Sequence, residues 1–354
     1  MTPAQLLDAM QCVNGLLQAG EFGAARDRLQ AIVETHSDYA EAQRLLGGVT
    51  LMLGDAVGAE RILRRAIERD PHWAPIHTTL GELLLGRGRH AEAETFLQRA
   101  VAARQPDPHA AEVLARYYND RKQPARALAV VAPFCALDNV SPELIVQHVA
   151  ALVALGRSGD AIEWSRNLVA RSPDNAAAEQ ALATALQAAN RHGEAESTAR
   201  RALEHGPGNA TLCYTHARSL IALGAYDRAE AALRDCLRLE PQYIEAHGDL
   251  ARLVWMRTGD GNQATEAINQ ALQTFSNNDA LWAAKAAVLQ GAGDVRAAYA
   301  CLATRIERAH AAPALQVRAG LAALEFDPRI ALERAECALR AAPDDSAART
   351  LQVA

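Results

Sequence analysis

The chain has 354 residues, of which half are hydrophobic and only 5% aromatic, and its formal net charge is −6. This composition favours an Ala- and Leu-rich core between closely packed helices over a β-sandwich or barrel, which would need more Val, Ile, Thr and aromatic residues. The negative charge gives no electrostatic reason to expect nucleic acid or an anionic membrane as a partner.

A repeat of 34 residues begins near Leu6 and runs almost to the last residue. One position of the repeat is alanine in every copy, which indicates that two helices approach closely once per unit. The first seven of these alanines are spaced by multiples of 34, and the last three drift by one residue. They are Ala25, Ala59, Ala93, Ala127, Ala161, Ala195, Ala229, Ala264, Ala298 and Ala331.

In chain order, the repeats start near residues 6, 40, 74, 108, 142, 176, 210, 244, 279 and 312, and a partial helix covers 346–354. Apolar residues recur at helical spacing in two blocks per unit, so each unit is predicted to be a pair of helices. Most units carry, between the blocks, a residue suited to left-handed backbone: Gly20, Gly54, Gly88, Gly156, Asn190, Gly224 and Gly293. Several units close with a proline that cannot continue the second helix: Pro71, Pro173, Pro207, Pro241 and Pro343.

This pattern resembles the tetratricopeptide repeat family. The resemblance is carried by the repeated alanine, the closing prolines and two further positions of the unit. The first helix has a small residue at its packing point (Gly47, Gly81, Ala115, Ala183, Ala217 and Ala251), and an apolar residue follows four positions after the repeated alanine (Leu29, Leu63, Leu97, Val131, Leu233, Ile268 and Leu302). The resemblance implies one all-α solenoid over residues 1–354, with about ten antiparallel helix pairs in a right-handed superhelix and first helices lining a concave groove.

Positions 2, 5, 9 and 12 of each repeat project onto one face of its first helix. In this topology that face lines the groove, and we call a selected set of its polar and aromatic residues, named below, the first-helix stripe. Arginine, amide, hydroxyl and aromatic groups suit a peptide backbone or acidic side chains, although a merely solvated face is an equally open interpretation. The stripe comprises Arg44, Thr78, Glu82, Glu112, Arg116, Asn119, Gln180, Thr184, Gln187, Tyr214, Arg218, Glu245, Arg252 and Trp255.

The cysteines and the N-terminus predict a cytoplasmic protein, and the alanine-rich composition is typical of a GC-rich bacterial genome. The six cysteines have no paired spacing, and most fall where other repeats carry small apolar residues, so neither disulfides nor zinc are expected. Residues 1–5 lack the features of a signal peptide, and no apolar run reaches the roughly 18 residues of a membrane span.

No nucleotide-binding, hydrolase or metalloprotease motif occurs, so we expect no catalytic residue, cofactor or metal. The leading hypothesis is a scaffold, not an enzyme, that binds a peptide or partner protein in its groove. An alternative is the substrate-recruiting arm of a larger enzyme, because residues 346–354 begin another first helix without a polar capping helix. Residues 250–260 also look like the arrays that precede bacterial iron and 2-oxoglutarate-dependent oxygenase domains. End-to-end self-association is a third possibility.

Overall fold

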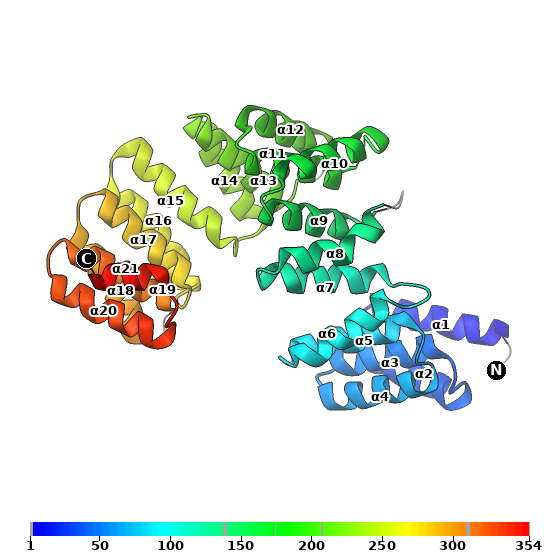
Figure 1. Ribbon diagram of the computed structural model, residues 1–354. Coiled ribbons are helices and arrows are strands. Elements are labelled where there is room, and N and C mark those ends of the chain that lie inside the picture. The colour runs from blue at the N-terminus through cyan, green and yellow to red at the C-terminus, as the bar shows by residue number, and fades with distance from the viewer. Residues whose placement is uncertain (1–2, 137–139, 174, 207, 309–311, 354) are drawn as a thin grey trace. The chain divides into compact units, whose positions relative to one another are not determined.

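A computed structural model describes residues 3–136, 140–173, 175–206, 208–308 and 312–353. In these residues every regular element is an α-helix, as the repeat predicts (Figure 1). Pro207 and Ala354 lie outside the described residues. Of the described helices, none combines the length and the apolar character needed to cross a membrane.

The helices alternate between first and second members of a pair. The first helices are α1 (Pro3–Gln18), α3 (Ala40–Met52), α5 (Ala74–Gly86), α7 (Pro108–Asp120), α9 (Pro142–Ala154), α11 (Ala176–Ala188), α13 (Ala210–Ala222), α15 (Ile244–Thr258), α17 (Asp279–Gly291), α19 (Pro313–Leu324) and α21 (Ser346–Val353). The second helices are α2 (Phe22–Thr35), α4 (Ala56–Arg69), α6 (His90–Val101), α8 (Pro124–Cys135), α10 (Ser158–Arg171), α12 (His192–His205), α14 (Tyr226–Leu239), α16 (Gly261–Thr274), α18 (Val295–Arg308) and α20 (Pro328–Ala341).

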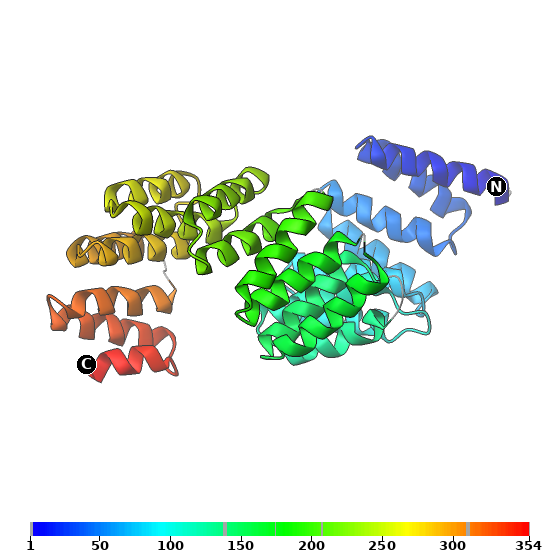
Figure 2. The same cartoon turned by 90° about the horizontal axis from the view of Figure 1, so that it is seen from above.

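The chain forms two compact units, Met1–Ala161 and Ile162–Ala354, called unit 1 and unit 2 below. In both units most first helices pack against the second helix of their own pair and against that of the pair before it; α3 contacts α4 and α2, and α13 contacts α14 and α12. Figure 2 shows the helices from above. This nearest-neighbour packing is that of an α-solenoid. That a single solenoid spans residues 1–354 stays a prediction.

The turns inside the pairs confirm the predicted left-handed residues. All six predicted glycines have positive φ values, and so does Asn190, at 58°. The fourth turn, for which the sequence offered no glycine or asparagine, uses Lys122 at φ 56°. A left-handed residue is therefore required at this turn even where the sequence supplies a poor one, because the chain must reverse within a few residues.

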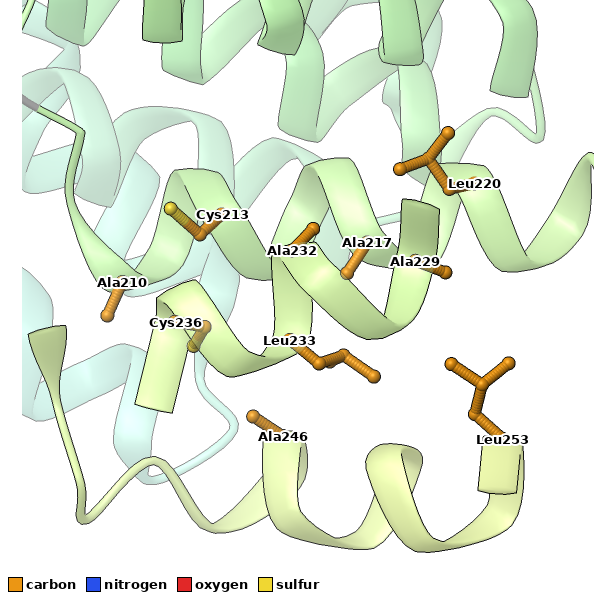
Figure 3. Close-up of a cluster of buried hydrophobic side chains, with 10 residues drawn as sticks. All are labelled: Ala210, Cys213, Ala217, Leu220, Ala229, Ala232, Leu233, Cys236, Ala246 and Leu253. Carbon is orange, nitrogen blue, oxygen red and sulfur yellow. The ribbon is translucent and has the colours of Figure 1, made fainter. Parts of the chain in front are cut away.

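The repeated alanines lie at the centre of the packing. Nine of the ten are 0% exposed and Ala331 is 1% exposed, as the predicted close approach of the helices requires. Figure 3 shows the core around Ala229, where buried residues of α13, α14 and α15 meet. Cys213 and Cys236 belong to this cluster, and burial raises the pKa of the Cys236 thiol to about 12, so both fill space as small apolar residues. Cys12, by contrast, is exposed.

Candidate partner-binding surface

The first-helix stripe consists of one segment in each unit. In unit 1 it lies on α3, α5 and α7, and in unit 2 on α11, α13 and α15. Within the segments α3 contacts α5, α5 contacts α7, and α11 contacts α13, while a hydrogen bond from Tyr214 to Asp249 links α13 to α15. Side chains of the stripe therefore have partners on the next first helix within reach.

Three stripe residues at position 5 of their repeats bridge to the residue that caps the next first helix. Thr78 Oγ1 donates a hydrogen bond to Asp107 Oδ2 at 2.5 Å, and Asn209 Nδ2 donates one to Gln180 Oε1 at 2.6 Å. The Ser141 hydroxyl donates a hydrogen bond to Glu112 Oε1. Asp107, Ser141 and Asn209 are also the N-caps of α7, α9 and α13. Thr78 and Gln180 are buried. The side chains of these three stripe residues thus stabilise the contact between consecutive repeats.

Glu82 and Glu112 share one histidine. His109 Nε2 lies 3.0 Å from Glu82 Oε1, and its Nδ1 lies 3.0 Å from Glu112 Oε2. The hydrogen bond to Glu82, aided by the one to Glu112, raises the pKa of His109 to about 9. The ring is therefore protonated at neutral pH and offsets the negative charge of this part of the stripe. The helix-supporting pair of Glu112 with Arg116, which their i, i+4 spacing suggests, does not occur.

Two further stripe residues of unit 1 also have internal partners. Arg44 forms an ion pair with Glu41 of the same helix at 2.7 Å, and Asn119 Nδ2 donates to Gln147 Oε1 on α9 at 2.8 Å. Arg116 differs, since it is exposed and makes no ion pair within the described residues. It is the stripe residue of unit 1 most available to a guest.

In unit 2 the structure gathers three stripe residues into a cluster around Asp249, a residue absent from the prediction. Tyr214 Oη donates to Asp249 Oδ2 at 2.9 Å, and Arg252 donates to Asp249 Oδ1 at 2.8 Å. The Arg218 guanidinium carbon lies 5.9 Å from the centre of the Tyr214 ring. The centres of the Tyr214 and Tyr243 rings are 4.9 Å apart. Burial and the nearby Asp249 carboxylate raise the pKa of Tyr214, which keeps its hydroxyl a proton donor.

Both arginines of this cluster are exposed, while the tyrosines are half-buried. Aromatic rings fixed by neighbours, with guanidinium groups at their edge, are the composition of interface hot spots. We call Tyr214, Arg218, Tyr243, Asp249 and Arg252 the tyrosine–arginine cluster.

The remaining stripe residues of unit 2 are more dispersed. Thr184 donates to the Gln180 carbonyl of its own helix at 2.9 Å, Gln187 is half-buried, and Glu245 is exposed. The Trp255 ring packs edge-on against α17, where a Cβ added to Gly291 would lie 2.9 Å from the ring. Part of the Trp255 ring is therefore covered by the next repeat, which leaves less of the ring available to contact a partner than the sequence predicts.

Sequence reasoning missed the bridging partners because each lies outside the stripe positions. A usable signal does exist: an Asp, Ser or Asn at the last position of a unit marks the N-cap of the next first helix. A polar residue 29 positions earlier then faces it, as Thr78 faces Asp107. No such signal marks Asp249, which stands at position 6 of its repeat, one residue after the stripe position 5.

Histidine and acidic side chains show no arrangement for metal chemistry in the described part of the chain, where no three of His, Cys, Asp and Glu come together as metal ligands would. His247 Nε2 contacts the Pro241 carbonyl at 2.8 Å, whereas Asp249 faces Tyr214 and Arg252. The two side chains point to different partners, as expected for residues two apart on a helix.

Family models match several stretches of the chain. Tetratricopeptide repeat models match residues 50–117 in one case and residues 13–72 and 214–280 in another. The model of subunit 3 of the anaphase-promoting complex, or cyclosome, matches residues 155–236. No curated protein sequence matches significantly.

Solved structures show the same fold at low sequence identity. A tetratricopeptide repeat protein from Parabacteroides merdae is 12% identical, with a TM-score of 0.53, and the match covers 70% of this chain and 98% of that one. A human IFIT1 dimer with PPP-AAAA is 16% identical, with a TM-score of 0.54 and coverage of 94% and 83%. Yeast Tom70 is 14% identical, with a TM-score of 0.51 and coverage of 99% and 88%. The fold is thus an α-solenoid of tetratricopeptide-like helix pairs, with repeat models of that family matched in both units.

Proposed function

We propose that this protein is a non-enzymatic scaffold that binds a peptide or partner protein along its first-helix stripe. Solenoids of this kind generally mediate protein–protein interaction through the extended surfaces that stacked repeats create. A partner with acidic groups fits best, because the exposed stripe residues include Arg116, Arg218 and Arg252.

The observation that supports the proposal most is the tyrosine–arginine cluster. Asp249 binds Tyr214 and Arg252 at once and so fixes both side chains before any partner arrives. Fixed side chains lose little conformational entropy on binding, which favours affinity. Arg218 makes no ion pair within the described residues, so its guanidinium is free to receive a carboxylate.

The test compares two triple variants in their capture of partners from the native lysate. The first reverses the exposed stripe arginines: Arg116→Glu, Arg218→Glu and Arg252→Glu. The second reverses three exposed arginines outside the stripe, Arg28→Glu, Arg104→Glu and Arg318→Glu, and therefore changes the net charge equally. We expect the stripe variant to lose the captured protein and the control to retain it, with circular dichroism unchanged in both.

Equal capture by the two variants would reject the stripe as the binding surface. Loss in both would show that net charge, not the stripe, governs capture. A cytoplasmic location and a bacterial source remain predictions.

The two alternatives from the sequence also remain predictions. None of the matched family models is an oxygenase domain, so the likeness of residues 250–260 to oxygenase-linked arrays rests on sequence alone. For self-association, Leu7 on α1 and Val353 on α21 are 63% and 88% exposed. Light scattering at rising concentration tests it, and a strict monomer throughout would contradict it.

A further inference from the structure

Unit 1 contains a groove between two second helices, neither of which carries a stripe residue. Its walls are α2 and α4, its floor is α3, which packs against both, and its volume is about 790 Å³. This volume is within the range of ligand-binding pockets. We call it the α2–α4 groove. Its lining residues relevant here are Arg26 and Val33 of α2, Leu46 of α3, and Arg61, Ile62, Arg65 and Arg69 of α4.

Ion pairs join some consecutive second helices, such as α6 with α8 and α12 with α14, but within the described residues none joins the two walls of this groove. Elsewhere the residue after the repeated alanine is often a buried or half-buried glutamate that binds an arginine of the next pair. Glu196 of α12 binds Arg228 of α14 at 2.6 Å, and Glu94 of α6 binds Arg126 of α8. These pairs hold neighbouring second helices together.

In the first repeat that glutamate is replaced by Arg26, which pairs with Asp27 of its own helix at 2.8 Å. Gly58 stands at the repeat position of Arg126 and Arg228, so α4 offers no side chain there to reach α2. Within the described residues, no ion pair joins α2 to α4. Two departures from the repeat pattern therefore leave this groove unbridged.

One wall of the groove is a row of arginines. Arg61, Arg65 and Arg69 follow one another at four-residue spacing on α4 and span about 12 Å along the helix axis. No other repeat carries more than one arginine at these three positions. Arg61 and Arg65 are exposed and make no ion pair within the described residues, whereas Arg69 donates to the Ser37 carbonyl.

The charge of the groove is opposite to that of the whole chain. Its lining contains four arginines against Glu34 and Asp55, while the chain carries −6. The Asp55 carboxylate already accepts a hydrogen bond from the Gly58 N–H at 2.7 Å, as the N-cap of α4. The arginines thus lack enough carboxylates inside the protein to pair with, and an acidic guest would supply them.

The rest of the lining favours a peptide over a nucleic acid. No aromatic side chain lines the groove, so it lacks the stacking platforms on which single-stranded bases are held. Val33, Leu46 and Ile62 instead offer an apolar surface between the charged walls. An apolar side chain with carboxylates on either side matches this arrangement.

We propose that the α2–α4 groove is a second binding site, which takes an acidic peptide segment of a partner protein. Carboxylates of the segment pair with Arg61 and Arg65, and an apolar residue between them packs on Val33, Leu46 and Ile62. The proposal is independent of the first-helix stripe, because the two surfaces share no residue.

The test uses fluorescence anisotropy with a short labelled peptide of glutamate and leucine, in the full chain. Comparison probes are the same peptide with glutamine in place of glutamate, and an oligouridylate of matched charge. We expect the glutamate peptide alone to bind, and Arg61→Glu with Arg65→Glu to weaken binding at least about ten-fold. Arg104→Glu with Arg318→Glu changes the net charge equally and should leave binding unchanged.

A milder pair, Arg61→Gln with Arg65→Gln, serves if the charge reversal reduces helical content, and it should weaken binding in the same direction. The proposal is overturned if the glutamate peptide does not bind or if the groove variants bind it as well as the wild type does. It is also overturned if the oligouridylate binds more tightly than the peptide and through the same arginines.

Discussion

Two adjacent glycines of α3 should respond in opposite ways to the same substitution. A Cβ added to Gly47 would lie 2.6 Å from Leu63 Cδ2 and 2.7 Å from its Cγ, whereas a Cβ added to Gly48 meets nothing within 4 Å. Leu63 is fully buried, so its branch point has little room to move. The contact is therefore a test of how tightly the two helices of a pair approach.

The expected magnitudes follow from two opposing effects. Replacing glycine by alanine inside a helix stabilises it by about 1 kcal/mol, and this is all that Gly48→Ala should show. Overpacking a core typically costs about 1–3 kcal/mol, so after the helix gain is subtracted Gly47→Ala should be destabilised by a net ~0–2 kcal/mol. The two variants should thus differ by the overpacking cost, ~1–3 kcal/mol.

A compensating substitution sharpens the test. The fourth repeat has Ala115 and Val131 where the second has Gly47 and Leu63, and both of these residues are fully buried. Adding Leu63→Val to Gly47→Ala should therefore recover part of the loss, so that the double variant is more stable than the sum of the single changes.

The measurement is urea unfolding followed by circular dichroism, with hydrogen exchange of α3 and α4 amides as the local probe, because repeats contact only their neighbours. A Gly47→Ala protein as stable as Gly48→Ala would refute the packing described for this pair.

Two other predictions concern packing and charge. Ala195→Leu should overpack α12 against its neighbours and cost about 1–3 kcal/mol in the same unfolding assay, and a neutral result would contradict the central place of this alanine. His109 should titrate near pH 9 in an NMR titration, because Glu82 and Glu112 favour its charged form. The pKa of His109 in the folded protein exceeds the value of about 6.5 that a histidine has in an unfolded chain. Its contribution to the stability of the fold is therefore complete below about pH 6.5 and is lost as the pH rises through about 9. A midpoint near 6.5, or no loss of stability relative to His109→Gln over this range, would contradict the two hydrogen bonds.

The sequence predicted the fold well because a strict repeat multiplies each local signal. An alanine at one position in ten copies, with glycine or asparagine at the break, leaves few alternatives to paired helices. Lys122 shows the limit of such signals, since its left-handed conformation is imposed by the turn and not by its own preference.

The surface was less predictable, because its chemistry depends on pairs of side chains from different repeats. Periodicity places Thr78 on the stripe, but only the structure shows that its hydroxyl is used by Asp107. The α2–α4 groove illustrates the same point in reverse. Neither Arg26 nor Gly58 alone predicts a groove. Their effect becomes clear only when they are compared with Glu196 and Arg228, which stand at the same repeat positions and form an ion pair.

The proposal that the stripe receives the partner is tested most directly by site-specific photo-cross-linking. A benzophenone side chain replaces either Arg218, in the tyrosine–arginine cluster, or Arg318, which is also exposed and lies in the same unit but outside the stripe. After irradiation in native lysate, mass spectrometry identifies the attached protein. Our account predicts a specific cross-linked partner from position 218 and none from position 318. The same partner from both positions, or from position 318 alone, would contradict it.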